Sequence, residues 1–394
     1  MSTRGFDTKA IHAGTSGFTP DAMCVPIYQS VAYPYQDAQE AAEIFRGEKP
    51  GFTYGRWDNP TVAVFEKRMA ALENTEGAIA AASGMSAIFL LTHHMVQPGE
   101  EVVSSNRVYG GTFGLFDVGL KRMGAKVNWV TNPESLEAWE KAITPKTKFL
   151  FVETPSNPAL FIADIPALAA LAKSKKLPLV VDNTITTPAL QLPISLGADI
   201  VVHSTTKYIC GNATSLGGIV CGPREIVEGI RQNGIRYLGP AMAPFNAWMN
   251  LIGLETLSLR MDRHCHNAMA VATFLEKHPR VKYVNYPGLE SNPYHKLIKP
   301  QMKGCSSLMS FELDGTYQDA TRFIDALQII IHATHLGTCK SIVTHPASTT
   351  HSAMGEVEMR KAGISPSMIR FSIGIEDEKD LIGDLDQAFN ALKS

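Results

Sequence analysis

The chain has 394 residues, of which 45% are hydrophobic and 19% charged, and its formal net charge is −2. This composition is ordinary for a globular protein, and the length predicts two domains, because one hydrophobic core rarely serves more than about 250–300 residues. The sequence shows no basic block, no leader-like apolar start and no apolar stretch of membrane-spanning length, so we expect no nucleic acid or membrane partner and predict a cytoplasmic protein.

The six cysteines are scattered along the chain without a Cys-x-x-Cys pair. This arrangement favours reduced thiols over a disulfide framework or a zinc site. His264 and His266 flank Cys265 in a predicted helix, but residues two apart on a helix do not face each other. We therefore expect no metal site.

The first 55 residues show little regular periodicity, and glycines and prolines are spread along them. The segment carries too many apolar side chains for a free tail, namely Ile27, Tyr28, Val31, Tyr33 and Tyr35. We therefore predict that residues 1–55 form an N-terminal arm that wraps against a partner subunit. From Thr61 onward, apolar residues recur at the spacing of a helix.

A run of small residues leads into Ser83-Gly84-Met85-Ser86, and an apolar helix is predicted to follow up to Met95. Glycine at a helix start lets backbone N–H groups approach an anion, and the helix dipole favours negative charge there. The stretch therefore indicates either a phosphate site or simple tight packing of small residues.

Strands and helices are predicted to alternate through the middle of the chain. The predicted strands are continuous apolar runs, which indicate that both of their faces are covered. Alternation with helices predicts a mostly parallel sheet and therefore an α/β fold. The strands lie at 101–103, 126–130, 148–152, 177–181 and 200–202, and the helices at 114–123, 133–143 and 165–174.

Polar residues follow three successive predicted strands at the point where each strand ends. They are Glu153 and Asn157, then Asp182, then Ser204, Thr206 and Lys207. In α/β folds the carboxyl ends of the strands border the crevice in which ligands bind. Asp182 could pair with a pyridinium nitrogen and keep it protonated. Capping of a helix is the competing explanation for an aspartate at this point.

Lys207 is the only lysine of the stretch Ala198–Gly218, which has the pattern of a buried strand, a hydroxyl-rich turn and a glycine-rich end. If this amine is desolvated, its pKa falls and the neutral form becomes a nucleophile towards a carbonyl. Ser204 and Thr206 offer hydroxyls to a phosphate, so the stretch suggests pyridoxal phosphate held as a Schiff base. A surface lysine after a strand is the alternative.

Beyond Gly239, a turn-rich join is followed by one long predicted helix with an apolar stripe that runs to Leu275. The remaining elements predict a smaller, more alternating sheet and a C-terminal amphipathic helix. They are strands at 281–286, 307–313 and 368–373 and a helix at 377–393.

Arg370 lies in the last of these strands, on the face opposite to Ile369 and Phe371. An arginine fixed by a strand could hold a substrate carboxylate through two parallel hydrogen bonds. An ordinary exposed strand arginine is the alternative.

The stretch DIVVHSTTKYICG around Lys207 resembles the cofactor-lysine signature of the Cys/Met-metabolism, trans-sulfuration family of PLP-dependent enzymes. Further motifs match along essentially the whole chain and in the family's order: TYGRWDNPT, ASGMSAI, VYGGTF, ETPSNP, VDNTITTP, LGPAMAPFNAW, GLETLSLRMDRH, HPASTTH and IRFSIGIEDEKDL. The resemblance implies the PLP-dependent transferase fold type I, which is α/β with a mostly parallel sheet and a smaller α+β C-terminal domain. It also implies pyridoxal 5'-phosphate as the cofactor.

The resemblance further implies how individual residues bind the cofactor. Lys207 carries it as a Schiff base and later shuttles protons, and Tyr109 stacks on the ring and serves in acid–base steps. Asp182 pairs with the pyridinium, and Asn157 lies on the O3′ side. The phosphate is held by the backbone at Gly84 and Met85 and by the hydroxyls of Ser204 and Thr206.

The resemblance also implies which residues bind the substrate and which are contributed by a second subunit. Arg370 holds the substrate α-carboxylate, with Asn157 and His335 beside it. Tyr54 and Arg56 reach the phosphate of a neighbouring subunit's cofactor in a homotetramer built as a dimer of dimers. Tyr54 is also a candidate activator of the attacking amine. We predict an arm at 1–55, a PLP-binding domain at 56–240 and a C-terminal domain at 241–394.

Within the family, the motifs GPAMAPFNAW, GGTF and HPASTTH look like those of O-acylhomoserine sulfhydrylases. Such an enzyme is a transferase of methionine biosynthesis. It replaces the acyl group of an O-acylhomoserine, with acetyl favoured here, by sulfide or a small thiol to give homocysteine or methionine. The alternatives are a methionine or cystathionine γ-lyase, a cystathionine γ-synthase, and a PLP-binding regulatory paralogue with little turnover.

A few positions bear directly on this choice. Gly111 stands where many methionine γ-lyases carry a cysteine, and Thr334 where cystathionine γ-lyases often have a glutamate. Asn212 and Ala213 follow Gly211, where the family usually has His or Gln, and His335 takes a position usually filled by Ser or Asn. Both departures bear on how substrate is oriented and not on cofactor attachment.

Overall fold

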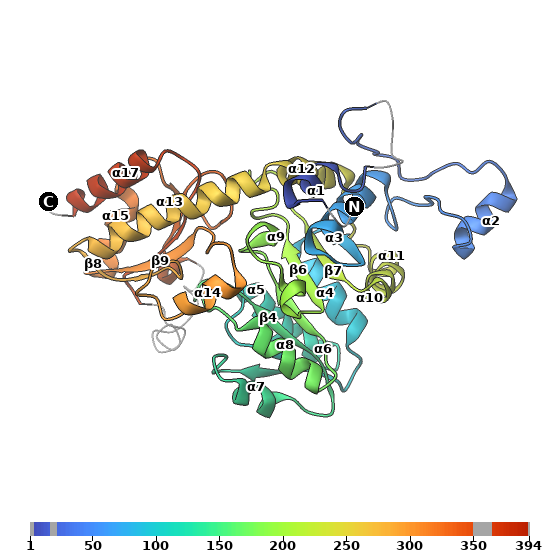
Figure 1. Ribbon diagram of the computed structural model, residues 1–394, viewed down its shortest axis with the longest axis horizontal. Coiled ribbons are helices and arrows are strands. Elements are labelled where there is room, and N and C mark those ends of the chain that lie inside the picture. Colours follow the sequence, from blue (N-terminus) through green and yellow to red (C-terminus); the bar gives the residue numbers. More distant parts are fainter. Residues whose placement is uncertain (1–3, 16–21, 350–364, 393–394) are drawn as a thin grey trace.

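The computed structural model of the protein describes residues 4–15, 22–349 and 365–392. The chain forms two lobes, each built around its own sheet, and an N-terminal arm extends from the larger lobe (Figure 1). Some predicted features lie outside the described residues: 1–3 and 16–21 of the arm, Thr350 and His351 of the HPASTTH motif, and Lys393 of the tail.

The larger lobe contains a seven-stranded sheet in the order β1-β7-β6-β5-β4-β2-β3. The neighbours from β6 to β3 are parallel, and β7 runs antiparallel to both β1 and β6. The mostly parallel sheet predicted from the sequence is therefore confirmed. The strands are β1 Gly77–Ala81, β2 Glu101–Ser105, β3 Lys126–Val130, β4 Thr147–Glu153, β5 Leu179–Asp182, β6 Ile200–Ser204 and β7 Gly218–Gly222. β1 and β7 are missing from the sequence-based prediction. β1 consists mostly of glycine and alanine, which have low strand propensity, and β7 has only three residues between two glycines.

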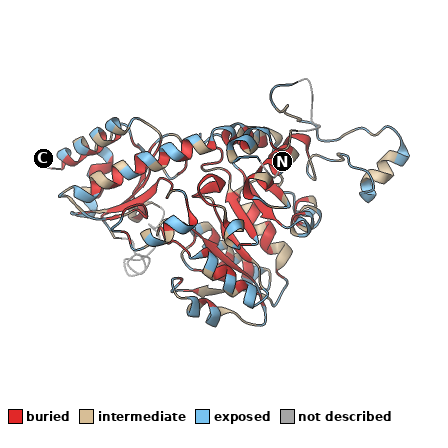
Figure 2. Ribbon diagram, viewed as in Figure 1, coloured by how far each residue is buried: buried red, intermediate tan, exposed pale blue. Residues whose placement is uncertain are grey.

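Helices cover both faces of this sheet, as the continuous apolar strands predict (Figure 2). In β5, Val180 packs with one set of helices and Val181 with the other, because successive side chains of a strand alternate. One face carries α4 Gly84–Met95, then α5 Gly110–Gly114 with its continuations η1 Leu115–Gly119 and α6 Leu120–Arg122, and α10 Arg224–Gly229 with η3 Ile230–Ile235. The other carries α3 Pro60–Glu73, α7 Leu136–Ala142, α8 Ile165–Ser174, α9 Thr187–Leu190 and α12 Pro244–Glu255.

The smaller lobe contains a mixed five-stranded sheet in the order β10-β11-β12-β9-β8, in which only the β10–β11 pair is parallel. Ile369 and Phe371 enter its core, and Arg370 lies on the opposite face, as predicted. The strands are β8 Val281–Asn285, β9 Leu308–Leu313, β10 Ile331–His332, β11 Ile342–Thr344 and β12 Met368–Ser372. The helices are α13 Leu257–Lys277, α14 His295–Gln301, α15 Tyr317–Ala326 and α17 Glu378–Ala391.

The single long helix predicted after Gly239 is in fact two helices, α12 and α13, which are interrupted at Thr256. Thr256 has φ −114° and ψ 12°, outside the helical region, and its hydroxyl accepts a hydrogen bond of 3.3 Å from Nε of Arg260. α13 then runs from the core of the larger lobe, where Leu257 packs, to that of the smaller lobe, where Leu275 packs. The domain boundary at residue 240 stays a prediction; α12, which follows it, packs against α3.

The N-terminal arm contains two short helices that sequence periodicity does not reveal, α1 Phe6–His12 and α2 Ala38–Arg46. α2 is capped by the side chain of Asp37, which accepts a hydrogen bond from the backbone N–H of Glu40. None of its residues is buried, and it projects away from both lobes (Figure 1). The arm therefore has surface that this single chain does not cover.

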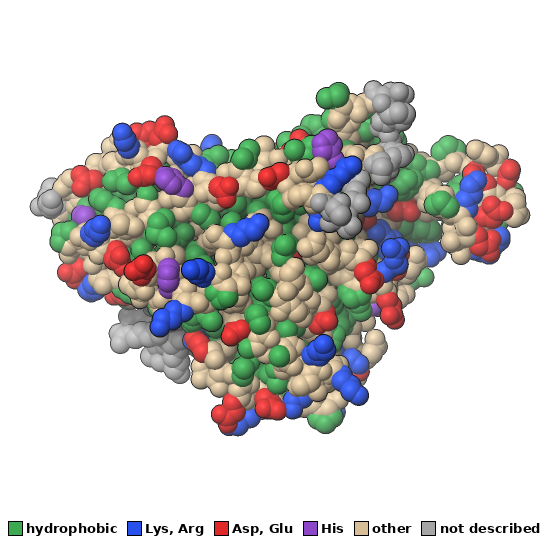
Figure 3. All heavy atoms as spheres, in the orientation of Figure 1, with side chains coloured by type: hydrophobic (Ala, Val, Ile, Leu, Met, Phe, Trp, Pro, Cys, Tyr) green, Lys and Arg blue, Asp and Glu red, His purple; other side chains and the backbone are tan. Residues whose placement is uncertain are grey.

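Acidic and basic side chains are interspersed over the face of the molecule shown in Figure 3, on both lobes and at the tip of the arm. Within the described residues, no helix combines the length and the apolar character that crossing a bilayer requires.

Candidate active site

A cavity of about 600 Å³ opens at the carboxyl ends of β4, β5 and β6, where β12 of the smaller lobe faces the larger sheet. Ten of the twelve residues that the sequence predicts for the site line it: Gly84, Met85, Tyr109, Asn157, Asp182, Ser204, Thr206, Lys207, His335 and Arg370. The other two, Tyr54 and Arg56, do not line this cavity. The strand ends thus meet at one edge, as the parallel sheet requires.

The first turn of α4 forms part of the cavity wall. The hydroxyl of Ser83 caps this helix by accepting a hydrogen bond of 3.1 Å from the N–H of Ser86. A Cβ added at Gly84 would lie 2.6 Å from Cβ of Ser204, so only glycine allows the helix to sit against the end of β6. The first N–H groups of a helix have no partner within it. Those of Gly84 and Met85, together with the Ser204 hydroxyl, therefore form a cradle for an anion.

The carboxyl group of Asp182, at the end of β5, also lines the cavity. Thr184 donates to its Oδ1 twice, from the hydroxyl at 2.6 Å and from the backbone N–H at 3.0 Å. The same hydroxyl accepts a 2.8 Å hydrogen bond from the backbone N–H of Ser204, so it ties the ends of β5 and β6 together. Burial raises the pKa of Asp182 above its ordinary value. A positively charged ligand group beside it would restore the ionised form.

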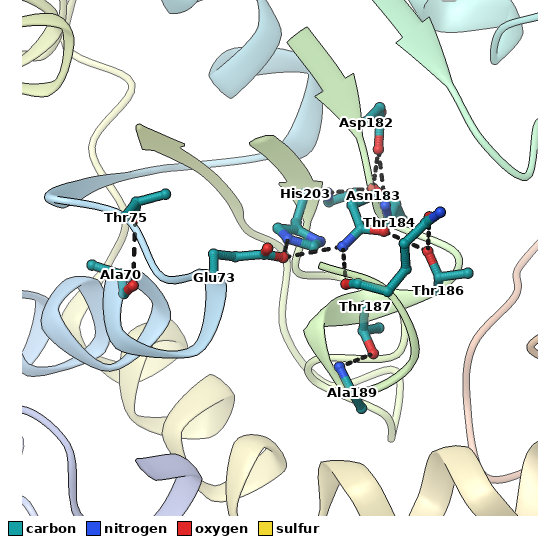
Figure 4. A network of polar contacts seen from close by, with 12 residues as sticks. Ala70, Glu73, Thr75, Asp182, Asn183, Thr184, Thr186, Thr187, Ala189 and His203 are labelled. Carbon is teal, nitrogen blue, oxygen red and sulfur yellow. Dashed lines mark hydrogen bonds and ion pairs between the residues drawn. The ribbon is translucent and has the colours of Figure 1, made fainter. Parts of the chain in front are cut away.

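Behind these two strand ends lies a buried polar network that sequence reasoning missed (Figure 4). Nε2 of His203 lies 2.6 Å from Oε1 of Glu73, at the end of α3, and the amide of Asn183 donates to the same oxygen at 3.1 Å. Both His203 and Glu73 are fully buried. Because His203 precedes Ser204 and Asn183 follows Asp182, the network holds both cavity residues from the far side of the sheet. The only signal in the sequence is the polar character of these positions beside apolar strands.

Lys207 also lines the cavity. Its Nζ is 3.3 Å from Nδ1 of His335, a distance at which the amine donates to the imidazole. Burial, reinforced by the positive charge of Arg370, lowers the pKa of Lys207 to about 8. Burial together with the charges of Lys207 and Arg370 lowers the pKa of His335 to about 4, so the imidazole is neutral near pH 7. The pair therefore provides a nucleophilic amine next to a proton acceptor.

Arg370 is buried, so the alternative of an ordinary exposed strand arginine is wrong. Its Nη1 donates to Oδ1 of Asn157 at 3.0 Å, and its Nη2 donates to the carbonyl of His335 at 3.2 Å and to the hydroxyl of Thr344 at 3.1 Å. Its Nε is a buried donor with no hydrogen-bond partner among the described residues. A guanidinium held in this way is oriented to bind a carboxylate in the cavity.

The loop after Lys207 is held by Arg260 of α13, whose Nη1 donates to the carbonyl of Tyr208 at 2.6 Å. Gly211 adopts φ +75°, and a Cβ there would collide with this guanidinium. Asn212, which stands where the family usually has His or Gln, turns back on its own loop. Its Oδ1 accepts a hydrogen bond of 3.3 Å from the N–H of Thr214. The Asn212 side chain therefore contacts the loop, and it does not line the cavity.

Tyr54 and Arg56 lie at the base of the arm. Nη1 of Arg56 donates to the carbonyl of Arg236, and its Cζ lies 5.4 Å from the centre of the Tyr54 ring. Tyr54 also pairs with Ala32 in a single β-bridge. Tyr54 is 40% exposed. Both predicted residues are thus held together outside the cavity of their own chain.

The cavity lining offers partners for a molecule that carries a phosphate, a basic ring nitrogen and an aldehyde. The anion cradle of α4, the Asp182 carboxyl and the Lys207 amine match these three groups, and the Tyr109 ring supplies an aromatic surface. Pyridoxal phosphate has this set of groups.

Comparison with known proteins agrees with this fit. A family model described as Cys/Met metabolism PLP-dependent enzyme matches residues 7–390. The chain is 43% identical over 387 residues to an O-succinylhomoserine sulfhydrylase from Pseudomonas aeruginosa, covering 98% of this chain and 96% of that protein. It is 41% identical over 392 residues to an L-methionine gamma-lyase from Pseudomonas putida, covering 98% of each.

A solved structure of a protein from Campylobacter jejuni, assigned as an O-acetylhomoserine (thiol)-lyase, has a TM-score of 0.94 to this chain at 37% identity. The match covers 98% of this chain and 100% of that one. That structure carries N'-pyridoxyl-lysine-5'-monophosphate.

The lowered pKa of Lys207 predicts unusual reactivity in the cofactor-free protein. Brief labelling with acetic anhydride between pH 6 and 10, followed by mass spectrometry, should modify Lys207 with a midpoint near pH 8. Exposed lysines should follow the ordinary pKa of about 10.4. Arg370→Gln should raise the Lys207 midpoint, because it removes a neighbouring positive charge. A Lys207 midpoint that coincides with that of the exposed lysines would contradict the prediction.

Proposed function

Because the chain belongs to the family of Cys/Met metabolism PLP-dependent enzymes, we propose that it catalyses γ-replacement on an O-acylhomoserine. Sulfide or a small thiol replaces the acyl group, with acetyl favoured, and the product is homocysteine or methionine. Pyridoxal phosphate is the cofactor, and when bound it supplies an electron-withdrawing ring that stabilises negative charge at the substrate Cα.

In this proposal the cofactor is held by groups from several elements of the larger lobe. Lys207 binds its aldehyde carbon covalently, Asp182 binds its ring nitrogen, Tyr109 lies against its ring and Asn157 binds its O3′ side. The phosphate is held by the backbone of Gly84 and Met85 and the hydroxyls of Ser204 and Thr206. Asp182 becomes ionised when it receives a protonated ring nitrogen, because the partner charge offsets the burial that raises its pKa.

The substrate end is organised by Arg370, which binds the α-carboxylate with Asn157 and His335 beside it. This places the substrate Cα next to Lys207, whose amine takes and returns protons there. His335 accepts a hydrogen bond from that amine, so it orients the lone pair for proton transfer. Loss of a proton from Cβ then lets the acyloxy group leave from Cγ as a carboxylate. The sulfur nucleophile adds to Cγ, and Cβ and then Cα regain their protons.

The observation that carries the choice of a sulfhydrylase is the space around Gly111. A Cβ at this position would lie 2.5 Å from Cε1 of Tyr109 and 3.0 Å from Sδ of Met85. The Tyr109 ring therefore occupies the space that a side chain at 111 would need. Many methionine γ-lyases carry a cysteine at the matching position, so Gly111 and the Tyr109 ring above it weigh against methionine cleavage. The GGTF, GPAMAPFNAW and HPASTTH motifs support the same choice.

Methionine or cystathionine γ-elimination is the second candidate, because the methionine gamma-lyase from Pseudomonas putida is nearly as similar to the chain as the sulfhydrylase from Pseudomonas aeruginosa. Both reactions pass through one β,γ-unsaturated intermediate after the leaving group departs. A pocket that excludes water and admits a small sulfur nucleophile gives replacement, whereas one that lets the intermediate be reprotonated and leave gives elimination.

We also propose that the site is completed by a second copy of the chain within a homotetramer. Tyr54 and Arg56 lie outside the cavity of their own chain, and they follow an arm whose helix α2 has no buried residue. Val31 and Phe45 of this arm are 60% and 58% exposed. Exposed apolar side chains in an extended arm support a covering partner.

The reaction is tested with the purified holoenzyme and O-acetylhomoserine, O-succinylhomoserine, methionine and cystathionine, each with and without sulfide. Homocysteine should form from O-acetylhomoserine and sulfide about tenfold faster than 2-oxobutanoate forms from methionine, a barrier difference of about 1.4 kcal/mol. Dominant methionine cleavage at saturating substrate and sulfide would replace the proposed function with the lyase alternative.

His335→Asn should raise the share of elimination by about threefold or more, because the smaller side chain opens the space beside Lys207 to water. Homocysteine and 2-oxobutanoate are measured in the same reaction, and the visible absorbance of the bound cofactor should not change. His332→Asn, an exposed histidine of the same lobe, is the matched control. An unchanged ratio of homocysteine to 2-oxobutanoate in His335→Asn would show that His335 does not influence the choice between replacement and elimination.

A shared site predicts complementation between inactive chains. Arg56→Ala and Lys207→Ala chains, mixed and allowed to re-equilibrate, should recover about a quarter of wild-type activity. The reason is that half of the dimers are mixed, and each mixed dimer regains one intact site of two. Each variant alone is the baseline. If mixtures confirmed by mass spectrometry to contain mixed dimers show no recovery, then each site lies within one chain.

A further inference from the structure

Glu153 ends β4 and lines the cavity, yet the proposed reaction gives it no role. Its side chain is almost fully buried, with 4% of the residue exposed. Oε2 accepts a hydrogen bond of 2.6 Å from the backbone N–H of Tyr109, and Oε1 accepts one of 2.7 Å from the backbone N–H of Asn157. One carboxyl group therefore joins two chain segments that are far apart in sequence.

Both of these segments carry side chains of the proposed site. Tyr109 stands at the start of α5, after β2, and 50% of the residue is exposed, so packing alone does not fix the ring. Asn157 follows β4, and its Oδ1 accepts the 3.0 Å hydrogen bond from Nη1 of Arg370. A continuous series of hydrogen bonds thus runs from Tyr109 through Glu153 and Asn157 to Arg370.

We propose that Glu153 is a positioning residue that sets where the Tyr109 ring lies against the cofactor and, through Asn157, where Arg370 meets the substrate carboxylate. It touches neither cofactor nor substrate in this role; it acts through the backbone of Tyr109 and Asn157. The role rests on the proposed function only in so far as Tyr109 faces the cofactor and Arg370 faces the substrate.

The need for two acceptor oxygens explains why a glutamate stands here. A glutamine has one acceptor oxygen, and its NH₂ group would face one of the two N–H groups, so one of these hydrogen bonds is lost. An aspartate keeps both oxygens but is one methylene shorter. The Asp182 carboxyl lies next to Glu153 in the β4–β5 register. Burial, and after it this neighbour, raises the pKa of Glu153 to about 8, whereas the hydrogen bonds from the N–H groups of Tyr109 and Asn157 favour the ionised carboxylate and oppose the rise. A buried acid in such a costly position is expected to have a defined task.

The test compares Glu153→Gln and Glu153→Asp with Glu101→Gln. Glu101 is a matched control because it is also a buried glutamate of the same sheet, with 5% of the residue exposed. It accepts hydrogen bonds of 2.6 Å from Asn128 and 2.7 Å from Thr144. Glu101 is the first residue of β2 and lies at the amino ends of the parallel strands, whereas the cavity lies at their carboxyl ends. Four quantities are measured: the Kd for pyridoxal phosphate, the visible circular dichroism per bound cofactor, kcat and KM, and the Tm of the cofactor-free protein.

Glu153→Gln should weaken pyridoxal phosphate binding roughly tenfold, since a buried N–H loses its acceptor and the ring it positions is released. The visible circular dichroism per bound cofactor should fall by about half, and KM for the amino-acid substrate should rise severalfold. Glu153→Asp should lie between wild type and Glu153→Gln. Glu101→Gln should lower Tm by an amount similar to Glu153→Gln while leaving the other three measurements at wild-type values.

Wild-type cofactor affinity and circular dichroism in Glu153→Gln would overturn the positioning role, as would changes that Glu101→Gln reproduces. If Glu153→Gln does not fold, Glu153→Asp decides by the same measurements, with wild-type values again overturning the role. Cofactor affinity and circular dichroism do not depend on which substrate reacts. Failure of the sulfhydrylase proposal is therefore distinguishable from failure of this one.

Discussion

The close approach of α4 to the end of β6 is the contact on which the rest of the site depends. Gly84 lies against Ser204, and a Cβ on Gly218 of β7 would collide with the carbonyl of Ser83. Only glycines allow a helix start to reach this far into the edge of a sheet. The contact brings unpaired N–H groups to the strand ends and so creates an anion cradle where Lys207 and Asp182 are also presented. The cavity exists because these backbones can touch.

Burial of Lys207 and Asp182 shifts their pKa values, and it also costs free energy because the charged forms lose water. Removing Lys207 and Asp182 from water disfavours their charged forms, which lowers the pKa of the amine and raises that of the carboxyl. The surrounding hydrogen bonds limit this burden: Thr184 holds Asp182, and the Glu73–His203 pair holds the strand ends from behind. Under the proposed function, a cofactor with a phosphate, a ring nitrogen and an aldehyde binds these groups together, so cofactor binding stabilises the lobe.

The arm and the smaller lobe complete the cavity in different ways. Arg370 lies on β12, whose other face packs into the core of the smaller lobe. The backbone of Arg370 is therefore held by that core, and its guanidinium is oriented by the hydrogen bond to Asn157. Tyr54 and Arg56 sit outside the cavity on an arm with exposed apolar side chains. Arg370 is therefore in place within one chain, whereas Tyr54 and Arg56 need a second chain to reach a cofactor, under the proposed assembly.

The strand ends, Lys207, Asp182 and the face on which Arg370 lies all follow from the sequence by itself, because apolar runs and the two-residue period of a strand are local properties. Local patterns did not reveal α2, the interruption at Thr256, Thr184 as the link between Asp182 and Ser204, or the buried Glu73–His203 pair. Glu153 stood out in the sequence as a polar strand end without a role. Its two hydrogen-bond partners became visible only in the fold, because both are backbone N–H groups: that of Tyr109 lies on a distant segment, and that of Asn157 lies four residues further along the same one. Backbone groups are the same in every residue, so only the tertiary structure decides which of them a side chain meets.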